Sequence, residues 1–164
     1  MFAQHALNLL DRLPPSEPRA LLRARLLLVL GNVQWQSAMS GTHVTLQDAF
    51  TSIRAAKAVL PETAPLEIAT ELAVLTAGVC YDLGALDDLQ YALGELTTMC
   101  RRWLDAGAPM QAARLLNDQA AIYVRLGDPV RAVHLLMESQ KLFEAVLPGP
   151  GKSGNVGIRG NHTT

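Results

Sequence analysis

The sequence predicts an all-α protein, a solenoid of about three helix-turn-helix repeats with a period of 43 residues. Gly41, Gly84 and Gly127 recur at this interval, each between two apolar segments of helical length. A fixed period of about 20–50 residues is typical of stacked helical units that bury their apolar faces against one another. Of the 164 residues, 49% are hydrophobic but only 5% aromatic, which favours helices packed on helices over a β-sandwich.

Residues 2–13 are expected to form a second helix that lacks its repeat partner. Leu13-Pro14-Pro15 ends this helix, because proline cannot continue the helical hydrogen-bond ladder. Leu60-Pro61 and Leu147-Pro148 end later second helices in the same way. The helix carries an apolar stripe made by Phe2, Ala6, Leu9, Leu10 and Leu13. An unpartnered stripe of this kind predicts self-association through the helix, or a longer array of which it is part.

Repeats 1 and 2, at residues 19–61 and 64–106, follow one pattern of first helix, glycine turn and second helix. Thr45 is the expected N-cap of the second helix in repeat 1. The buried positions of the first helices are predicted to be Leu30, Gln34 and Ser37, then Ala73, Ala77 and Cys80. Those of the second helices are Leu46, Ala49, Phe50, Ile53, Ala56 and Leu60, then Leu89, Ala92, Leu93, Leu96, Met99 and Trp103.

Repeat 3, at residues 108–147, has the clearest pattern. Gly127 is expected to end its first helix with a positive φ, Asp128 to cap the second helix, and Pro129 to occupy its first turn. The predicted buried positions of the first helix are Leu116, Ala120, Tyr123 and Val124. Those of the second helix are Ala132, Leu135, Leu136, Ser139, Leu142, Phe143 and Val146.

The last residues, 148–164, hold five glycines and two prolines and have little apolar content. Such a composition predicts a disordered tail. Gly151-Lys152-Ser153 copies the end of a phosphate-binding loop, but Val146 stands where that loop needs its first glycine. A predicted helix also precedes it where a strand is required, so we expect no nucleotide site.

The predicted repeats resemble the tetratricopeptide repeat, most closely in repeat 3. Ala120 falls at the family's small residue, Tyr123 at its tyrosine, Gly127-Asp128 at its turn, and Ala132 at its small residue in the second helix. The resemblance covers residues 19–147 and implies a right-handed α-α superhelix. Arg23 to Trp35 and Leu115 to Leu136 are similar to the longer helical repeats of large bacterial regulators, namely maltose-type transcriptional activators and signalling ATPases fused to cyclase or kinase modules.

The resemblance also implies a binding groove on the inner face of the first helices. The candidate protein-binding residues are Trp35, Met39, Glu71, Tyr81, Asp82, Arg114, Asn117 and Arg125, with Leu28, Ala38, Val74 and Val124 at further groove positions. Trp35, Tyr81 and Arg125 are residue types that anchor protein interfaces. Aromatic spacing alone leaves open whether Trp35 faces this groove or packs against the helix at residues 2–13. The lysine and asparagine pattern by which some members of the family hold a peptide carboxylate is not reproduced.

The sequence offers no pattern for catalysis, cofactor binding or metal binding. His5, His43, His134 and His162 are scattered, with no histidine four residues from another and no cysteine at ligand spacing. Asp87-Asp88 falls on a helix face opposite the apolar stripe, where charged residues belong. Cys80 and Cys100 lie within helical patterns and are expected to be small buried hydrophobic residues in a reducing compartment. We therefore expect a protein that is not an enzyme.

Charge and hydropathy exclude several partners. The formal net charge is −1, which gives no electrostatic footprint for nucleic acid or for an anionic membrane surface. The longest aliphatic run, Leu26 to Leu30, is far shorter than the roughly 20 residues that span a bilayer. The amino terminus lacks the basic and apolar regions of a secretory signal, so we expect a cytoplasmic location.

The function predicted from these patterns is that of a non-enzymatic scaffold for protein–protein interaction. Its partner is expected to be a protein or peptide in the concave groove, and its context a larger bacterial signalling or transcriptional regulator. One alternative is a helical domain that senses a small-molecule effector. A polar pocket closed on both sides would favour the sensor, and an open, continuous groove would favour the scaffold. Another alternative is the C-terminal part of a multidomain ATPase, kinase or cyclase polypeptide.

Overall fold

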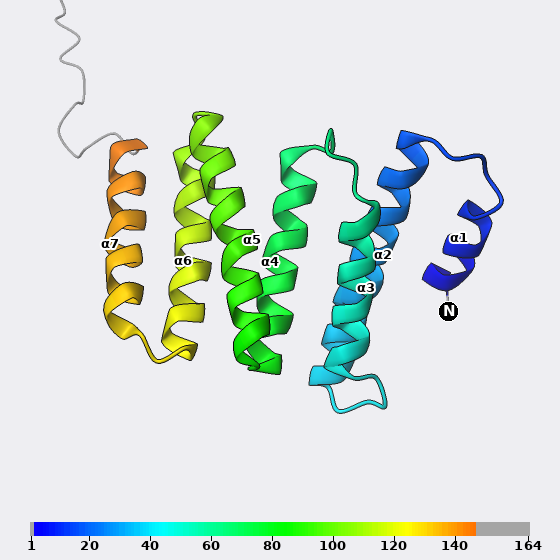
Figure 1. The fold of residues 1–164 in the computed structure, drawn as a ribbon, viewed down its shortest axis with the longest axis horizontal. Helices are drawn as coiled ribbons and strands as arrows, with labels where there is room; N and C mark the ends of the chain where they lie inside the picture. The colour runs from blue at the N-terminus through cyan, green and yellow to red at the C-terminus, as the bar shows by residue number, and fades with distance from the viewer. Residues whose placement is uncertain (1, 147–164) are drawn as a thin grey trace, which may run out of the picture.

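A computed structural model describes residues 2–146, which form seven α-helices and no strand (Figure 1). The all-helical prediction is therefore confirmed for these residues. The helices are α1 (Phe2–Leu10), α2 (Glu17–Met39), α3 (Leu46–Val59), α4 (Leu66–Leu83), α5 (Leu86–Asp105), α6 (Pro109–Arg125) and α7 (Pro129–Val146). The predicted tail at 148–164 lies outside the described residues.

Three helical hairpins stand side by side in a row, with α1 at one end and α7 at the other (Figure 1). The hairpins are α2–α3, α4–α5 and α6–α7, and each spans one of the predicted repeats. The first helices α2, α4 and α6 pack on one another in order, and we call them the first-helix layer. The second helices α3 and α5 meet through long side chains instead: Phe50 packs edge-on against Tyr91 at 6.3 Å, and Lys57 pairs with Glu95.

The predicted turns and caps are present at the hairpin bends. Gly41, Gly84 and Gly127 have φ of 74°, 73° and 78°, in the left-handed region where a side chain would be strained. The hydroxyl of Thr45 accepts the backbone N–H of Asp48 at 3.1 Å, and Asp48 accepts the backbone N–H of Thr45 at 2.8 Å. This reciprocal capping box begins α3. Asp128 accepts the backbone N–H of Arg131 at 3.0 Å and so caps α7 as predicted.

The core follows the predicted stripes most closely in the α4–α5 hairpin. Ala73, Ala77 and Cys80 of α4 are buried, as are all but one of the predicted positions of α5. The exception, Leu93, is partly buried. Both thiols are buried, and this burial raises the pKa of Cys80 to about 12 and raises that of Cys100 as well. The two cysteines thus act as small apolar residues, as the sequence indicated.

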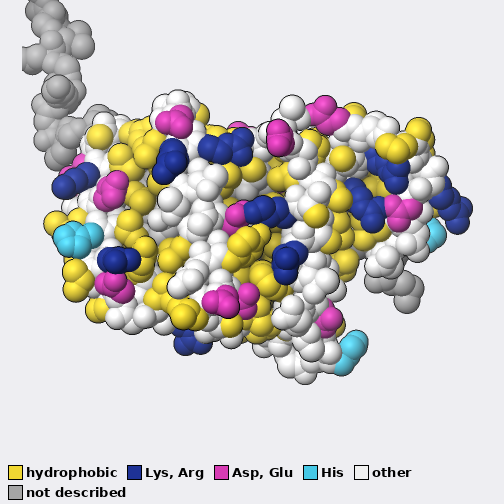
Figure 2. All heavy atoms as spheres, in the orientation of Figure 1, with side chains coloured by type: hydrophobic (Ala, Val, Ile, Leu, Met, Phe, Trp, Pro, Cys, Tyr) yellow, Lys and Arg dark blue, Asp and Glu magenta, His cyan; other side chains and the backbone are white. Residues whose placement is uncertain are grey.

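Several predicted core positions at the end of the row are exposed, and these predictions are wrong. Leu136 and Val146 of α7 are 48% and 46% exposed, and Val124 of α6 is 58% exposed. Within residues 2–146, α6 is the only helix whose backbone lies close to that of α7, and only Ala132 and Ser139 of α7 are buried. Figure 2 shows hydrophobic side chains at the surface where α7 lies, interleaved with charged ones.

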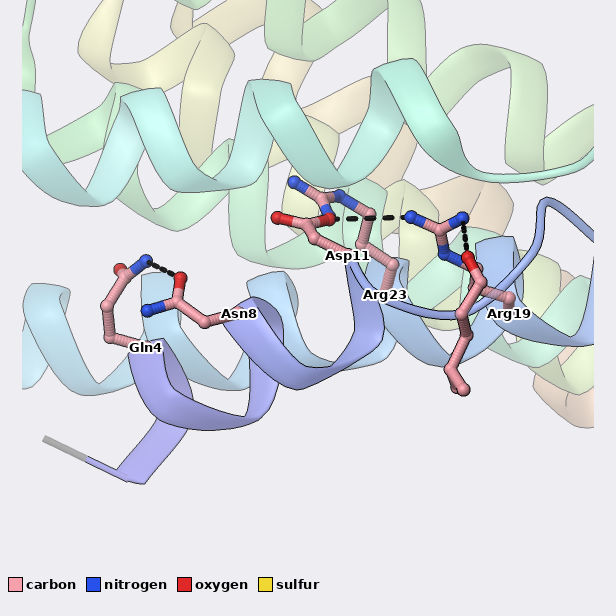
Figure 3. Close-up of polar contacts among 6 residues, drawn as sticks. Gln4, Asn8, Asp11, Arg19 and Arg23 are labelled. Atoms are coloured by element: carbon pink, nitrogen blue, oxygen red, sulfur yellow. Dashed lines mark hydrogen bonds and ion pairs between the residues drawn. The ribbon is translucent and has the colours of Figure 1, made fainter.

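The predicted stripe of α1 is also divided in the structure. Leu10 is buried together with Leu7, which was not predicted, whereas Leu9 and Leu13 are 49% and 53% exposed. The helix ends at Leu10, earlier than expected. Asp11 just after it pairs with Arg23 of α2 and lies 3.5 Å from Arg19 (Figure 3). Packing and ion pairs therefore hold α1 against α2.

Candidate functional site

The first-helix layer contains a cavity of about 480 Å³, which we call the Trp35 cavity. It is bounded by α2, α4 and α6. Its lining includes two aromatic side chains, Trp35 and Tyr81, and three carboxylates, Glu71, Asp82 and Asp118. Apolar side chains such as Val74, Leu75 and Ile122 complete its wall. Its volume and its mixture of apolar walls with a few polar groups are typical of a binding site.

A second cavity of about 420 Å³ adjoins the first, and we call it the Trp103 cavity. It is lined by α4, α5 and α6, including Glu67, Trp103 and Arg114. Glu71, Val74 and Asp118 line both cavities, so the two lie next to each other between α4 and α6. We refer to the two adjoining cavities together as the groove.

Each cavity contains a tryptophan whose indole is fixed by a residue of α4. Trp35 Nε1 donates to Asp82 Oδ2 at 2.7 Å, and Trp103 Nε1 donates to Thr70 Oγ1 at 2.8 Å. Both tryptophans are inserted into the molecule, yet each keeps its only polar atom bonded. The walls of the groove are therefore held in place before any ligand arrives.

Gly78 of α4 allows the Trp35 ring to lie where it does. A Cβ atom at Gly78 would come within 2.5 Å of the ring atom Cη2 of Trp35. Only a residue without a side chain leaves room for this contact. Trp35 therefore packs across α4 rather than against α1, and the ring both covers the core and lines the groove. The sequence left open whether Trp35 faces the groove or packs in the core. Its side chain is half-buried and does both.

Tyr81 and Arg125 lie at the end of the groove where α4 and α6 finish. The Arg125 guanidinium carbon is 5.5 Å from the centroid of the Tyr81 ring, a cation–π distance. Tyr81 is itself 38% exposed. The pair links the ends of two first helices and places one positive charge beside the Trp35 cavity.

Asp118 is one of the groove residues that sequence analysis missed. Burial raises the pKa of its carboxyl group, because the charged form loses hydration. Its position could have been inferred from the pattern, since it stands four residues after Arg114 on the same face of α6. Gly78 was also missed, although it stands seven residues after Glu71 on α4. Both lie on faces that the predicted residues already defined.

The structure brings part of the predicted set together. Five of the predicted groove residues, Trp35, Glu71, Val74, Tyr81 and Asp82, line the Trp35 cavity, and Arg114 lines the Trp103 cavity. Arg125 reaches the site through its contact with Tyr81.

The other predicted groove residues lie elsewhere. Met39 is 61% exposed near the end of α2, and neither it nor Asn117 is among the residues lining the two cavities. Leu28 is a further correction, since it is only 2% exposed and belongs to the core. It faces the covered side of α2, where a large apolar side chain is most stable.

The described residues also bear on metal binding and membrane insertion. Between residues 2 and 146, no three His, Cys, Asp or Glu side chains are grouped so that they could hold a metal ion. None of the seven described helices is long and apolar enough to cross a membrane. We find no family model, curated protein or solved structure that matches this chain.

Proposed function

We propose that the chain is a tetratricopeptide-like repeat module that acts by binding a polypeptide segment in the groove along α4 and α6. The observation that carries this proposal is the pair of adjoining cavities that share Glu71, Val74 and Asp118 as lining residues. Two neighbouring cavities along a pair of helices suit an extended or helical segment of a partner. The role is binding, and no catalytic step is part of the proposal.

Equivalent positions in the three hairpins support the repeat part of the proposal. Ile53, Leu96 and Ser139 stand 43 residues apart in the sequence and are 1%, 0% and 1% exposed. The three turn glycines keep the same interval and the same left-handed backbone. Repeated positions with repeated environments are expected in an α-α superhelix of stacked units. Their similarity to the repeats of bacterial signalling or transcriptional regulators makes such a regulator the proposed context.

A small-molecule effector is the second candidate, and one observation favours it. The Trp35 cavity alone, at about 480 Å³, falls within the range of about 300–1,000 Å³ common for small-molecule sites. The adjoining Trp103 cavity favours a polypeptide, because a longer ligand would use both volumes.

Selection from a random peptide display library tests the proposed function. We expect peptides that bind the full chain, and Val74→Trp should weaken this binding at least about ten-fold, because it places a large side chain at a position that lines both cavities. Val133→Trp on α7 is the matched control, since Val133 is also exposed, at 54%, but lies outside the groove. Thermal melts should show that both variants remain folded.

Two results would overturn the proposed function. One is a failure to enrich any peptide over an unrelated immobilised protein. The other is a set of peptides whose binding is equally strong with Val74→Trp and with the wild type. A metabolite that raises the Tm of the wild type but not of Val74→Trp, with no peptide binding, would favour the small-molecule candidate instead.

A further inference from the structure

We infer that the Trp35 cavity receives a lysine or arginine side chain of the bound polypeptide. This inference rests on the proposed function and names the chemistry of its ligand. It is carried by three features of the cavity: its aromatic walls, its carboxylates and a lining that, among residues 2–146, contains no lysine or arginine. Each feature selects for positive charge.

The aromatic walls come from Trp35 and Tyr81. Indole and phenol rings attract cations through the negative potential of their faces. The Arg125 guanidinium carbon lies 5.5 Å from the centroid of the Tyr81 ring, so a cation of the protein already uses this ring and the Trp35 ring is the aromatic wall that remains for a ligand. The Trp35 ring is held by its bond to Asp82 and by its seat on Gly78. It therefore presents a fixed surface to a ligand.

The carboxylates set the sign of the charge in the cavity. Glu71, Asp82 and Asp118 line it, and over residues 2–146 no lysine or arginine does so. The adjoining Trp103 cavity adds Glu67 and a single arginine, Arg114. Taken together, the lining of the groove has an excess of negative charge. A complementary positive group steers encounter and fixes the register of a bound segment.

Other ligand groups fit these surroundings less well. An apolar side chain would remove water from the carboxylates without replacing their hydrogen bonds. An acidic side chain or a terminal carboxylate would meet charges of the same sign. Asp118 in particular has already lost hydration, which is why burial raises the pKa of its carboxyl group. A cationic side chain of the ligand would supply an ion-pair partner, which the described residues do not give this carboxylate.

Five pools of nonapeptides test the inference, each with random flanking positions and a fixed central residue. The central residues are arginine, lysine, leucine, glutamate and citrulline, which is the neutral isostere of arginine. We expect the full chain to bind the arginine and lysine pools about ten-fold more tightly than the other three. Equal binding of the arginine and citrulline pools would overturn the inference.

Removing a negative charge and removing a positive charge from the groove should change the affinity for the arginine pool in opposite directions. Asp118→Asn should weaken binding of the arginine pool about ten-fold, whereas Glu138→Gln on exposed α7 should change nothing. Arg125→Gln, which removes a positive charge at the rim, should strengthen binding about two-fold. A merely structural role of these residues would weaken binding in both Asp118→Asn and Arg125→Gln, and that result would contradict the inference.

Failure of the inference and failure of the proposed function are distinguishable. If the leucine or glutamate pool binds best and Val74→Trp abolishes that binding, the groove still binds polypeptide but the cation assignment is wrong. If no pool responds to Val74→Trp, both fail. Agmatine carries a guanidinium without a polypeptide, and binding of agmatine as tight as that of the arginine pool would overturn the polypeptide source.

Discussion

The α4–α5 and α6–α7 hairpins follow the same sequence pattern but differ in how much of it they bury. Six residues of α5 are buried, including Leu96, Met99 and Trp103, whereas only Ala132 and Ser139 of α7 are buried. The difference comes from neighbours: the backbone of α5 lies close to those of both α4 and α6, while that of α7, within the described residues, lies close to that of α6 alone. A repeated pattern thus specifies the same hairpin three times, and the position in the row decides how much of each stripe is buried.

The largest expected effect compares the two second helices directly. Leu96 of α5 is 0% exposed and Leu136 of α7 is 48% exposed. Leu96→Ala should lower the free energy of unfolding by about 2–5 kcal/mol, because it leaves a cavity in a closed core. Leu136→Ala should cost less than about 1 kcal/mol, since half of that side chain is already in water. Urea unfolding followed by circular dichroism measures both.

If Leu96→Ala and Leu136→Ala lowered the free energy of unfolding by similar amounts, α5 and α7 would not differ in burial as the structure indicates. That result would mean that α7 is covered in solution by something other than α6. Repeating the measurement over a range of protein concentrations would then identify self-association as the cause, because a dimer becomes more stable as its concentration rises.

The second prediction concerns the contact by which α7 is attached. Ala132 is 1% exposed on α7 and Ala120 is 2% exposed on α6, as expected for two small residues at a close helix crossing. Ala132→Leu should therefore overpack the crossing and lower the free energy of unfolding by about 1–3 kcal/mol. Thermal melts of this variant and of Glu138→Gln, at an exposed site on the same helix, should separate. Equal midpoints would show that the two helices do not meet at Ala132.

The sequence predicts the local elements well because their causes are local. A glycine with positive φ, a capping threonine and a helix-ending proline each act within a few residues, and Gly84, Thr45 and Pro61 appear where the pattern requires them. Periodicity also identifies the buried face of a helix when other helices pack on both of its flanks. It fails at Leu9, Val124 and Leu136, because a spacing of three or four residues carries no information about whether another helix covers the stripe.

The candidate site was predicted in part for the same reason. Trp35, Glu71, Tyr81 and Asp82 come together because they share the face of the first helices that the repeat pattern defines. The role of Gly78 is to let the Trp35 ring pack against the backbone of α4, and the role of Asp118 comes from the partial burial of its carboxylate. Both depend on how closely α2, α4 and α6 approach one another. The helix preferences of single residues do not predict that distance.

The smallest expected effect is a change in stability at Asp118 of α6. This residue lines the groove, in contrast to the buried leucine and alanine positions above. Because its pKa is raised in the folded state, the folded protein holds the proton more tightly than the unfolded chain does, and stability falls as pH rises through that pKa. Asp118→Asn removes the cost of the buried charge and should raise the Tm at pH 7 by about 1–3 °C. The gain should shrink as pH falls and the wild-type carboxyl becomes protonated.

Glu138→Gln, which alters an exposed carboxylate of α7, is the control and should not shift the Tm at either pH. A lower Tm for Asp118→Asn at pH 7 would mean that the charge of Asp118 is already stabilised inside the protein, and the cavity would then have no need of a cation from a ligand. The expected combination, a more stable variant that binds the arginine pool less tightly, is typical of a residue kept for binding at a cost in stability. A packing residue would lose stability when substituted, so the two measurements on this single variant separate a ligand site from a structural one.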